Sequence, residues 1–528
     1  MKTRFIATAL AGGALALSLG GAVQTADASQ GAEIIRKSCL GCHTETDGRF
    51  SRISDQRKTP EGWLMTLVRM QMVHGVELAA DDRRALVKYL ADTQGLAPAE
   101  TAGARYALER RLDTPEAFES QAFTEMCARC HSGARVMLQR RPAEEWEHLV
   151  HFHLGQWPTT EYQALARDRD WFELALNEMV PELAATQPLT TEAWEQWRKR
   201  PAAEVAGTWT VAGQLPGRGA FSGAMTVEPG GTRDEYRIAL TGAYADGTAL
   251  TGQGTALIYT GFEWRGSLDV DGTAMRQVFA LEDGRLVGRM FERDHDEIGA
   301  DVVAARHGEG AHILAVQPEF LRAGEEAELT IVGAGLEGEP QLPDGIALVS
   351  VVERSPSRVV LRARAETAAL GVHTLKVGAA EGGSLAVFER VAALRVVPEY
   401  TVARVGGNGG STPPVQARFQ AEAWAAGADG VAGTEDDYRI GFMPANWSVA
   451  PFDEVAEADG DARFAGVMEA KSGIFMPAAA GPNPARRMGT NNAGNLRVLA
   501  ELDDGGQVLT GEGQMIVTVQ RWNNPPIP

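Results

Sequence analysis

All four cysteines of the chain fall in two copies of one short pattern, at residues 39–43 and 127–131. The fixed positions of the two copies are Cys39, Cys42, His43, Cys127, Cys130 and His131. In a C-x-x-C-H pattern, the two thiols can form thioethers with the vinyl groups of a haem, and the adjacent histidine is placed to bind the iron. The sequence therefore predicts two covalently bound c-type haems, each with its own proximal histidine.

A zinc site and a redox-active dithiol are the alternative interpretations of this pattern. A tetrahedral zinc site would need both motifs to converge on one ion and would leave the two histidines without a role. Two copies that use every cysteine of the chain favour covalent haem over both alternatives. Because no thiol is left over, we also expect no cysteine-derived redox cofactor in this chain.

A tryptophan followed by a segment rich in methionine or histidine comes after each motif. When Trp63 is aligned with Trp146, Met70 falls opposite His153, since each lies seven residues after its tryptophan. Methionine raises the potential of a haem, and a second histidine lowers it. The alignment therefore predicts Met70 and His153 as the sixth iron ligands, with a potential step between the two haems. The alternatives left open are Met72 and His74 for the first haem and His151 for the second.

The elements that must position these ligands repeat along the chain. A short helical pattern precedes each motif, and an amphipathic helix closes each unit, predicted at 81–94 and at 161–183. The preceding helices are predicted at 29–37 and 115–126. Residues 29–200 are thus expected to form a tandem cytochrome c unit, duplicated at an offset of about 85 residues.

The first 28 residues are typical of a secretory signal. Lys2 and Arg4 precede an apolar run at 5–23, and Ala26-Asp27-Ala28 matches the small-x-small cleavage pattern. We therefore expect a cleaved signal peptide at 1–28 and a periplasmic protein; a membrane anchor is the alternative. Elsewhere in the sequence no apolar stretch is long enough for a membrane span.

The rest of the chain has the short alternating runs and glycine turns of antiparallel β structure. Residues 201–310 are predicted to form an up-and-down barrel, 311–397 an immunoglobulin-like sandwich without a disulfide, and 398–528 a C-terminal β domain. A carboxylate-rich loop begins near Asp429. It lacks the EF-hand spacing, so a solvated loop is favoured over a Ca²⁺ site.

Composition limits the classes of function. The formal net charge of −20 over 528 residues argues against a nucleic-acid partner. The sequence contains no P-loop, no G-x-S-x-G and no H-E-x-x-H, and no catalytic residue is predicted. Two haems transfer single electrons, so the chain is expected to be the electron-accepting subunit of a larger dehydrogenase.

The chain resembles the alpha (di-haem cytochrome c) subunit of quinohemoprotein amine dehydrogenase, most tellingly at 63–75 and 149–155 and in the order of its domains. The resemblance implies a heterotrimeric bacterial periplasmic enzyme with a β-propeller subunit and a small subunit that carries cysteine tryptophylquinone. It also implies that primary amines are oxidised to aldehydes and ammonia, and that electrons leave through the two haems to an external cytochrome c or cupredoxin. The haem-attachment cysteines and proximal histidines carry over directly, and the quinone belongs to another chain.

Two other functions remain as alternatives. A stand-alone di-haem enzyme of the peroxidase type would need one haem with an open sixth site, which the candidate ligands after both motifs argue against. An electron carrier whose β domains bind a surface or a polysaccharide would need aromatic-rich binding strips, which the sequence lacks.

Overall fold

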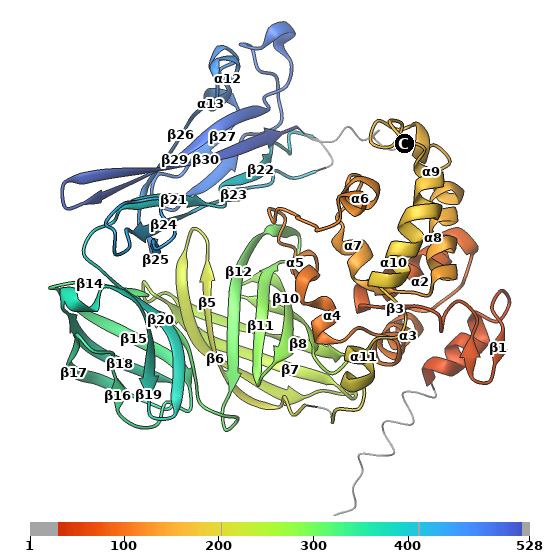
Figure 1. The fold of residues 1–528 in the computed structure, drawn as a ribbon, viewed down its shortest axis with the longest axis horizontal. Coiled ribbons are helices and arrows are strands. Elements are labelled where there is room, and N and C mark those ends of the chain that lie inside the picture. Colours follow the sequence, from red (N-terminus) through yellow and green to blue (C-terminus); the bar gives the residue numbers. More distant parts are fainter. Residues whose placement is uncertain (1–29, 202, 410–411, 520–528) are drawn as a thin grey trace, which may run out of the picture.

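The computed structural model describes residues 30–201, 203–409 and 412–519, so the predicted signal peptide lies outside the described residues. A β-barrel occupies the middle, with the helical N-terminal region on one side and a β-sheet domain on the other (Figure 1). The C-terminal β domain lies above the barrel in the same view. Among the described helices, none combines the length and the apolar character needed to cross a membrane.

The first helical unit surrounds the motif at 39–43. A helix at 30–38 leads into it, the short strands β1 (Glu45–Thr46) and β2 (Arg49–Phe50) follow, and α2 (Pro60–His74) packs against α3 (Ala80–Thr93). The Thr59 hydroxyl accepts a hydrogen bond from the Gly62 N–H at 3.3 Å and caps α2, which ends at Gly75 in the left-handed conformation. The closing helix expected at 81–94 is therefore present as α3.

The second helical unit is more broken than predicted. Its helical elements are α6 (Gln121–Phe123), η2 (Thr124–Ala128), α7 (Ala134–Met137), α8 (Ala143–Gln156), η3 (Thr160–Tyr162), α9 (Trp171–Leu174), η4 (Ala175–Met179) and α10 (Val180–Thr186). The helix expected from residue 115 begins only at Gln121, because the Ser120 hydroxyl caps it, accepting from the Phe123 N–H at 3.0 Å. The closing helix expected from residue 161 begins at Trp171, where the Asp170 carboxylate is the cap.

Three short helices connect the two units and lead to the barrel. They are α4 (Pro98–Thr101), α5 (Arg105–Leu108) and α11 (Glu192–Trp197). The units themselves pair through β3 (Arg57–Lys58) and β4 (Gln139–Arg140), which run antiparallel with Arg57 opposite Arg140. Arg140 follows Arg57 by 83 residues, the same interval as that between Trp63 and Trp146. Equivalent residues therefore meet across an approximate two-fold axis, as an internal duplication allows.

The predicted barrel is confirmed. Each strand pairs antiparallel with the next, and the last pairs with the first to close the ring. The strands are β5 (Gly207–Leu215), β6 (Gly219–Pro229), β7 (Glu235–Tyr244), β8 (Ala249–Tyr259), β9 (Glu263–Val270), β10 (Thr273–Glu282), β11 (Arg285–Glu292) and β12 (His295–Arg306). Trp209, Trp264 and Phe221 fill the interior and leave a void of only about 10 Å³ beside Gln277. The interior of the barrel is therefore a packed core.

The next domain forms one continuous sheet in the order β16-β19-β20-β13-β15-β18-β17, with β14 beside β20. Its strands are β13 (His312–Gln317), β14 (Phe320–Arg322), β15 (Glu326–Ala334), β16 (Pro340–Gln341), β17 (Ile346–Arg354), β18 (Arg358–Ala365), β19 (Gly371–Val377) and β20 (Ala380–Phe388). Both β13 and β14 run parallel to β20. The β character is as expected, whereas the immunoglobulin-like arrangement stays a prediction.

The C-terminal domain contains a four-stranded sheet and two three-stranded sheets around one apolar core. Its strands are β21 (Ala393–Val397), β22 (Tyr400–Arg404), β23 (Ala417–Arg418), β24 (Gln420–Ala425), β25 (Tyr438–Met443), β26 (Asn446–Pro451), β27 (Gly466–Met468), β28 (Ile474–Pro477), β29 (Gly494–Asp504) and β30 (Gln507–Thr518). Two short helices, α12 (Glu454–Ala458) and α13 (Asp461–Phe464), pack beside the four-stranded sheet.

The acidic loop of this domain uses its carboxylates internally. The Asp436 carboxylate accepts from the Thr434 hydroxyl at 2.7 Å, and the Asp429 carboxylate accepts from the Val431 N–H at 2.8 Å. The described residues contain no group of three or more histidine, cysteine or acidic side chains that could hold a metal ion. These hydrogen bonds engage the carboxylates of Asp429 and Asp436 within the loop itself.

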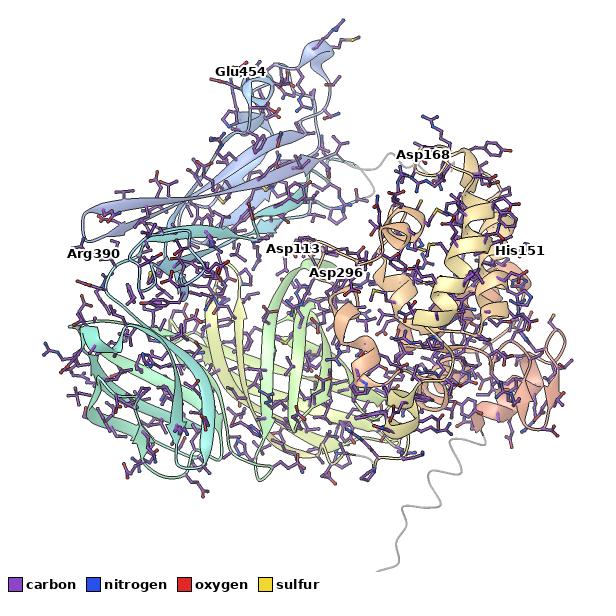
Figure 2. The ribbon with its side chains drawn as sticks, in the orientation of Figure 1. Asp113, His151, Asp168, Asp296, Arg390 and Glu454 are labelled. Atoms are coloured by element: carbon purple, nitrogen blue, oxygen red, sulfur yellow. The ribbon has the colours of Figure 1, made fainter. Side chains whose placement is uncertain are left out.

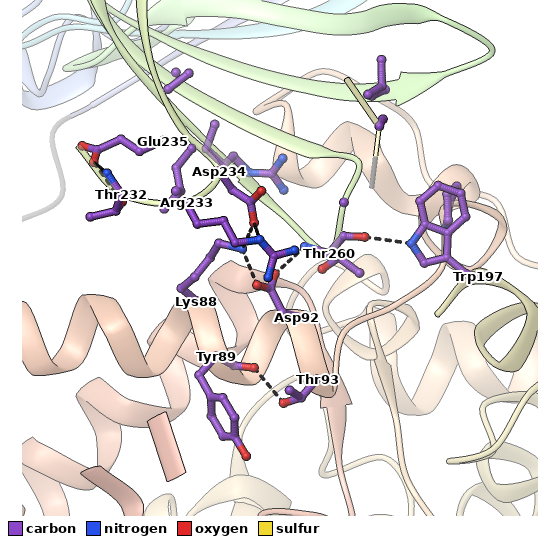
Figure 3. Close-up of a pocket in the computed structure, with 18 of the residues that line it drawn as sticks. Lys88, Tyr89, Asp92, Thr93, Trp197, Thr232, Arg233, Asp234, Glu235 and Thr260 are labelled. Atoms are coloured by element: carbon purple, nitrogen blue, oxygen red, sulfur yellow. Dashed lines mark hydrogen bonds and ion pairs between the residues drawn. The ribbon is translucent and has the colours of Figure 1, made fainter. Parts of the chain in front are cut away.

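The barrel supports the first helical unit through polar contacts beside a hollow of about 1400 Å³. Figure 3 shows Lys88 and Asp92 of α3 facing Asp234 and Thr260 of the barrel. The Lys88 ammonium lies 2.8 Å from the Asp234 carboxylate, and the Thr260 N–H donates to Asp92 at 2.8 Å. These contacts attach α3 of the first helical unit to the barrel.

Candidate haem centres

The first motif forms a tight turn at the end of the helix at 30–38. The Cys39 N–H donates to the Ile35 carbonyl at 2.8 Å, and the His43 N–H donates to the Cys39 carbonyl at 3.0 Å. Cys39 is half-buried against the apolar cluster that contains Ile34 and Trp63, and Cys42 is exposed. The second motif begins within η2 and has the same burial pattern, with Cys127 half-buried and Cys130 exposed.

The two histidines predicted as proximal ligands have the same hydrogen-bonding pattern. His43 Nδ1 lies 2.8 Å from the Ser51 carbonyl oxygen, and His131 Nδ1 lies 2.9 Å from the Ser132 carbonyl oxygen. A carbonyl can only accept, so Nδ1 carries the proton in each ring. This fixes the tautomer and leaves Nε2 with its lone pair available to a metal.

His153 has the same features on α8. Its Nδ1 donates to the Leu149 carbonyl at 2.7 Å, and its ring lies 5.5 Å from that of Trp171, centroid to centroid. Burial, together with the nearby guanidiniums of Arg135 and Arg69, holds the pKa of His153 below its usual range. The ring is therefore neutral, as an iron ligand must be.

The alternative on the same helix is placed differently. The side chain of His151 is 54% exposed, lies 3.8 Å from the Glu147 carboxylate, and sits at the outer edge of the molecule (Figure 2). Its ring packs edge-on against Phe172. The geometry thus favours His153 over His151 as the distal ligand.

Met70 lies on the same face of α2 as the buried residues Trp63 and Leu67, spaced at helical intervals from them. Met70 is half-buried, whereas Met72 is 82% exposed and His74, in the last turn, is exposed as well. The face of the helix that packs inward therefore offers Met70 as the ligand. Exposure argues against Met72.

The thiols suit covalent haem better than a dithiol. Burial raises the pKa of the Cys39 thiol and raises that of Cys127 to about 12. A redox dithiol needs a lowered pKa, because the thiolate is the reacting species. Three apolar side chains of α2, those of Leu64, Met65 and Val73, are between 42% and 48% exposed in the helix that carries Met70. Such surface fits an apolar macrocycle, so the residues present fit the haem that the motifs predict.

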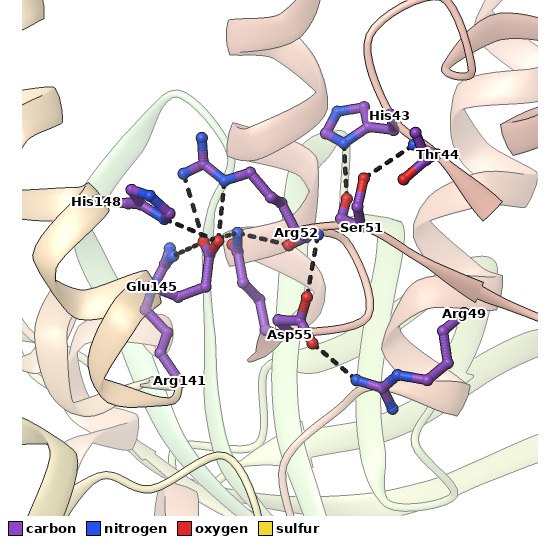
Figure 4. A network of polar contacts seen from close by, with 10 residues as sticks. His43, Thr44, Arg49, Ser51, Arg52, Asp55, Arg141, Glu145 and His148 are labelled. Carbon is purple, nitrogen blue, oxygen red and sulfur yellow. Dashed lines mark hydrogen bonds and ion pairs between the residues drawn. The ribbon is translucent and has the colours of Figure 1, made fainter. Parts of the chain in front are cut away.

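A polar network joins the two centres (Figure 4). Arg52, next to the Ser51 that holds His43, donates from Nε to the Glu145 carboxylate of α8 at 2.9 Å. His148 Nδ1 lies 3.2 Å from the same carboxylate. Burial alone would raise the pKa of Glu145, but the hydrogen bond and charge of Arg52, with the nearby His148 and Arg141, hold it below its usual range. Glu145 is therefore an anion that links the loop after the first motif to α8.

A second ion cluster lies on the approximate two-fold axis. The buried Glu100 carboxylate lies 2.8 Å from Arg57 Nη2 and 3.2 Å from Arg140 Nε. The Thr191 hydroxyl also donates to it at 2.8 Å. Sequence reasoning missed this cluster and the Arg52–Glu145 link, because both join residues that are far apart along the chain.

Comparisons with solved structures and curated proteins support no argument about the fold or function of this chain. A redesigned beta barrel bound to DFHBI is 17% identical over 19% of this chain and 90% of its own, with a TM-score of 0.17. Drosophila N-cadherin EC1-3 is 9% identical over 55% of this chain and 91% of its own, with a TM-score of 0.20. TM-scores this low have no bearing on fold or function. No curated protein matches the chain.

Family models, in contrast, match from end to end. The haem-binding model "Quinohemoprotein amine dehydrogenase A, alpha subunit, haem binding" matches residues 29–194. The models of alpha subunit domains II, III and IV match residues 202–307, 310–389 and 394–527 in the same order. With its haem-binding helical region followed by these β domains, the chain belongs to the family of quinohemoprotein amine dehydrogenase alpha subunits.

Proposed function

We propose that this chain is the electron-transfer and scaffold subunit of a periplasmic amine dehydrogenase. It carries two covalent haem c groups, receives electrons from a quinone on a partner subunit, and passes them to an external cytochrome c or cupredoxin. The observation that carries the proposal is the repeated geometry of the two centres. At each motif, two cysteines precede a histidine whose Nδ1 is held by a backbone carbonyl and whose Nε2 is available.

Each residue then has a defined part. The thiol pairs Cys39/Cys42 and Cys127/Cys130 would hold the macrocycles, His43 and Met70 would ligate one iron, and His131 and His153 the other. When bound, each haem iron supplies a one-electron acceptor and donor. The carbonyls behind the imidazoles orient the rings, and the Arg52–Glu145 link keeps the two centres at a fixed separation.

The ligand sets give the two haems different potentials. A thioether ligand favours the reduced iron, and a second imidazole favours the oxidised iron. With haem bound, His131 and His153 would hold the iron of lower potential, and His43 and Met70 would hold the iron of higher potential.

The oxidation of the amine is assigned to other chains. All four cysteines of this chain lie in the haem motifs, so a cysteine tryptophylquinone has to be built on a partner. In this proposal a small subunit carries that quinone, a β-propeller subunit completes a heterotrimer, and the β domains of this chain hold both. The products are an aldehyde and ammonia.

The proposed location is the periplasm. It rests on residues 1–28, whose positive start, apolar run and A-x-A site are typical of a cleaved export signal.

The composition of the native complex tests this assignment. After denaturation, we expect haem stain to remain on this chain and quinone stain to appear on a small companion polypeptide. A chain that runs alone, keeps its haem and binds carbon monoxide when reduced would instead support a stand-alone di-haem enzyme with an open site.

A further inference from the structure

A buried lysine lies against the helix that carries Met70. Lys58 is only 5% exposed, its Nζ donates to the Thr66 hydroxyl at 2.8 Å, and the same atom lies 5.1 Å from the ring centre of Trp63. Both contacts are with α2. Among the residues that the structure describes, no carboxylate forms an ion pair with Lys58, and the hydroxyl is its one hydrogen-bond acceptor.

The stem of Lys58 extends along α2 toward the first iron site. It passes over Gly62, where a Cβ would lie 3.0 Å from the Cβ of Lys58. Gly62, Thr66 and Met70 are spaced four residues apart and therefore form one row along the helix surface. The amine of Lys58 thus lies at Thr66, one helical turn before Met70.

The second unit has a cation at the same place, together with its counter-ion. Arg141 follows Lys58 by 83 residues, the offset of the duplication, and Glu145 is in the same way equivalent to Gly62. Arg141 is also 5% exposed and lies 5.6 Å from the ring centre of Trp146. Its Nη1 is 3.5 Å from the Glu145 carboxylate. The first unit therefore keeps the buried cation but has a glycine in place of the carboxylate.

A buried ammonium without an anion is unfavourable. Burial and the positive charges of Arg141 and Arg69 hold the pKa of Lys58 well below its ordinary value, against the charge of the more distant Glu145. That carboxylate already accepts from Arg52 at 2.9 Å. The described part of this chain therefore offers Lys58 no anion of its own.

We infer that Lys58 binds a propionate carboxylate of the haem held by His43 and Met70. This inference rests on the proposed function. Propionates are the carboxylates that a haem brings with it, and an ammonium pairs with a carboxylate through short, charge-assisted hydrogen bonds. The first haem is assigned because the amine lies in the row of α2 that leads to Met70. The equivalent cation of the second unit, Arg141, is already paired.

The ion pair raises the potential of the first haem. Reduction adds one negative charge to a haem, and a cation beside its propionate offsets part of that charge. At the second centre the charge of Arg141 is balanced by Glu145. Lys58 therefore adds to the potential step that the two ligand sets produce.

The test is a potentiometric titration of both haems in the complete complex, with wild type, Lys58→Met and Lys58→Arg. Lys58→Met keeps a stem of similar length and removes the charge. We expect the equilibrium constant for reduction of the His43/Met70 haem to fall about tenfold, which is about 59 mV for a one-electron couple. The His131/His153 haem should change less. Lys58→Arg keeps the charge and should retain most of the potential.

Lys37→Met is the matched control. Lys37 is an exposed lysine of the helix at 30–38, in the same unit, so its removal changes the net charge equally. Water and salt screen an exposed charge, and we expect little change in potential. A shift as large as that of Lys58→Met would mean that net charge alone acts, and would overturn the inference.

The pH dependence of the potential identifies the partner of the amine. A propionate paired with Lys58 stays ionised, so the wild-type potential should be constant between about pH 6 and pH 8. In Lys58→Met the unpaired, desolvated carboxyl takes up a proton on reduction, so the potential should fall as the pH rises. The other charged groups that face Lys58 are Arg141, Arg69 and Glu145, and they keep their charges in this range.

Two results would overturn the assignment of a propionate. A wild-type potential that depends on pH, or a Lys58→Met potential that does not, would mean that no carboxylate of the haem pairs with Lys58. A wild-type potential that moves with added phosphate at constant ionic strength would show that a free anion occupies the site.

The absorption spectra and haem stain separate this inference from the proposed function. A Lys58→Met complex that keeps two covalently attached low-spin haems but shows no shift contradicts only the role of the lysine. A wild-type chain without covalent haem contradicts the proposed function itself.

Discussion

Arg57 and Arg140 lie directly opposite each other in the β3–β4 pair, and they are equivalent residues of the two helical units. Both contact the same carboxylate, that of Glu100, which is buried between them. One anion on the approximate two-fold axis therefore balances one cation from each unit. This contact holds the two candidate haem centres in a fixed relation.

Removal of this anion should loosen the helical region. Burial opposes ionisation of Glu100, yet hydrogen bonds and charge from Arg57, with Ala97 and Arg140, keep its pKa below the usual value, so it is charged at neutral pH. Glu100→Gln leaves two buried guanidiniums without their anion and should destabilise the region by about 3–5 kcal/mol. Thermal unfolding followed by haem absorption measures this change.

Glu144, an exposed residue of α8, offers a control for the Glu100→Gln experiment. Glu144→Gln removes one negative charge from the surface of α8 and should change the unfolding temperature little. Because the pKa of Glu100 is depressed, its stabilising effect should be present above the usual carboxyl pKa and be lost as the pH falls through the folded value. Equal stability of Glu100→Gln and wild type at neutral pH would contradict the role of the cluster.

The proximal histidines should control the exit of electrons. His43→Ala or His131→Ala should remove low-spin ligation of one haem and block transfer to an external acceptor, while the partner quinone is still reduced by amine. Spectra of the haem and quinone under single-turnover conditions follow both steps. Unchanged turnover with the acceptor in both variants would refute the assignment.

Met70 can be tested against its neighbour on the opposite face of the helix. Met70→His should lower the potential of the first haem by on the order of 0.1 V, because the axial ligand sets the potential. Met72→His is the matched control, since this side chain is 82% exposed and points away from the core. A shift in the control but not in Met70→His would transfer the ligand role to Met72.

Glu263 should make the barrel interface sensitive to pH. Burial, with the negative charge of Glu61, raises the pKa of this carboxyl to about 7, against the opposing charge of Arg265. The folded chain then holds a proton that the unfolded chain has lost, so stability falls as the pH rises from about 4.5 to about 7. Relative to that of Glu263→Gln, the free energy of unfolding of the wild type should fall by on the order of 1–3 kcal/mol between pH 5 and pH 8.

Thermal unfolding of both proteins at the two pH values measures the difference. The variant keeps the Arg265–Glu61 contact, whose Nε–Oε1 distance is 2.6 Å. Parallel pH profiles for the two proteins would mean that Glu263 does not titrate in this range.

Local signals in the sequence were sufficient for much of the fold. The Asp271-Gly272 and Asp283-Gly284 pairs have a composition typical of two-residue hairpin turns, have positive φ at each residue, and connect β9 to β10 and β10 to β11. Residue character alternates along the barrel strands, and each strand pairs with the next one in the sequence. The barrel therefore follows from short-range pairing. The family was likewise recognisable from the two motifs and the domain order.

Contacts between residues far apart along the chain could not be predicted from the sequence. The Arg52–Glu145 link joins residues 93 positions apart, and the strands β3 and β4 contain two residues each, too few for a periodic signal. The closing helix of the second unit was placed too early, because the cap at Asp170 gives a weaker signal than the apolar residues around it. In the sheet domain, the parallel pairing of β14 with β20 has no local signature.

The central claim is that electrons from an amine reach both haems of this chain through a quinone on a partner. The most direct measurement is the haem absorption of the native complex after anaerobic addition of a primary amine. We expect both haems to become reduced, and the isolated chain, separated from its partners, to stay oxidised under the same conditions. Haems that stay oxidised in the complete complex with amine present would contradict it.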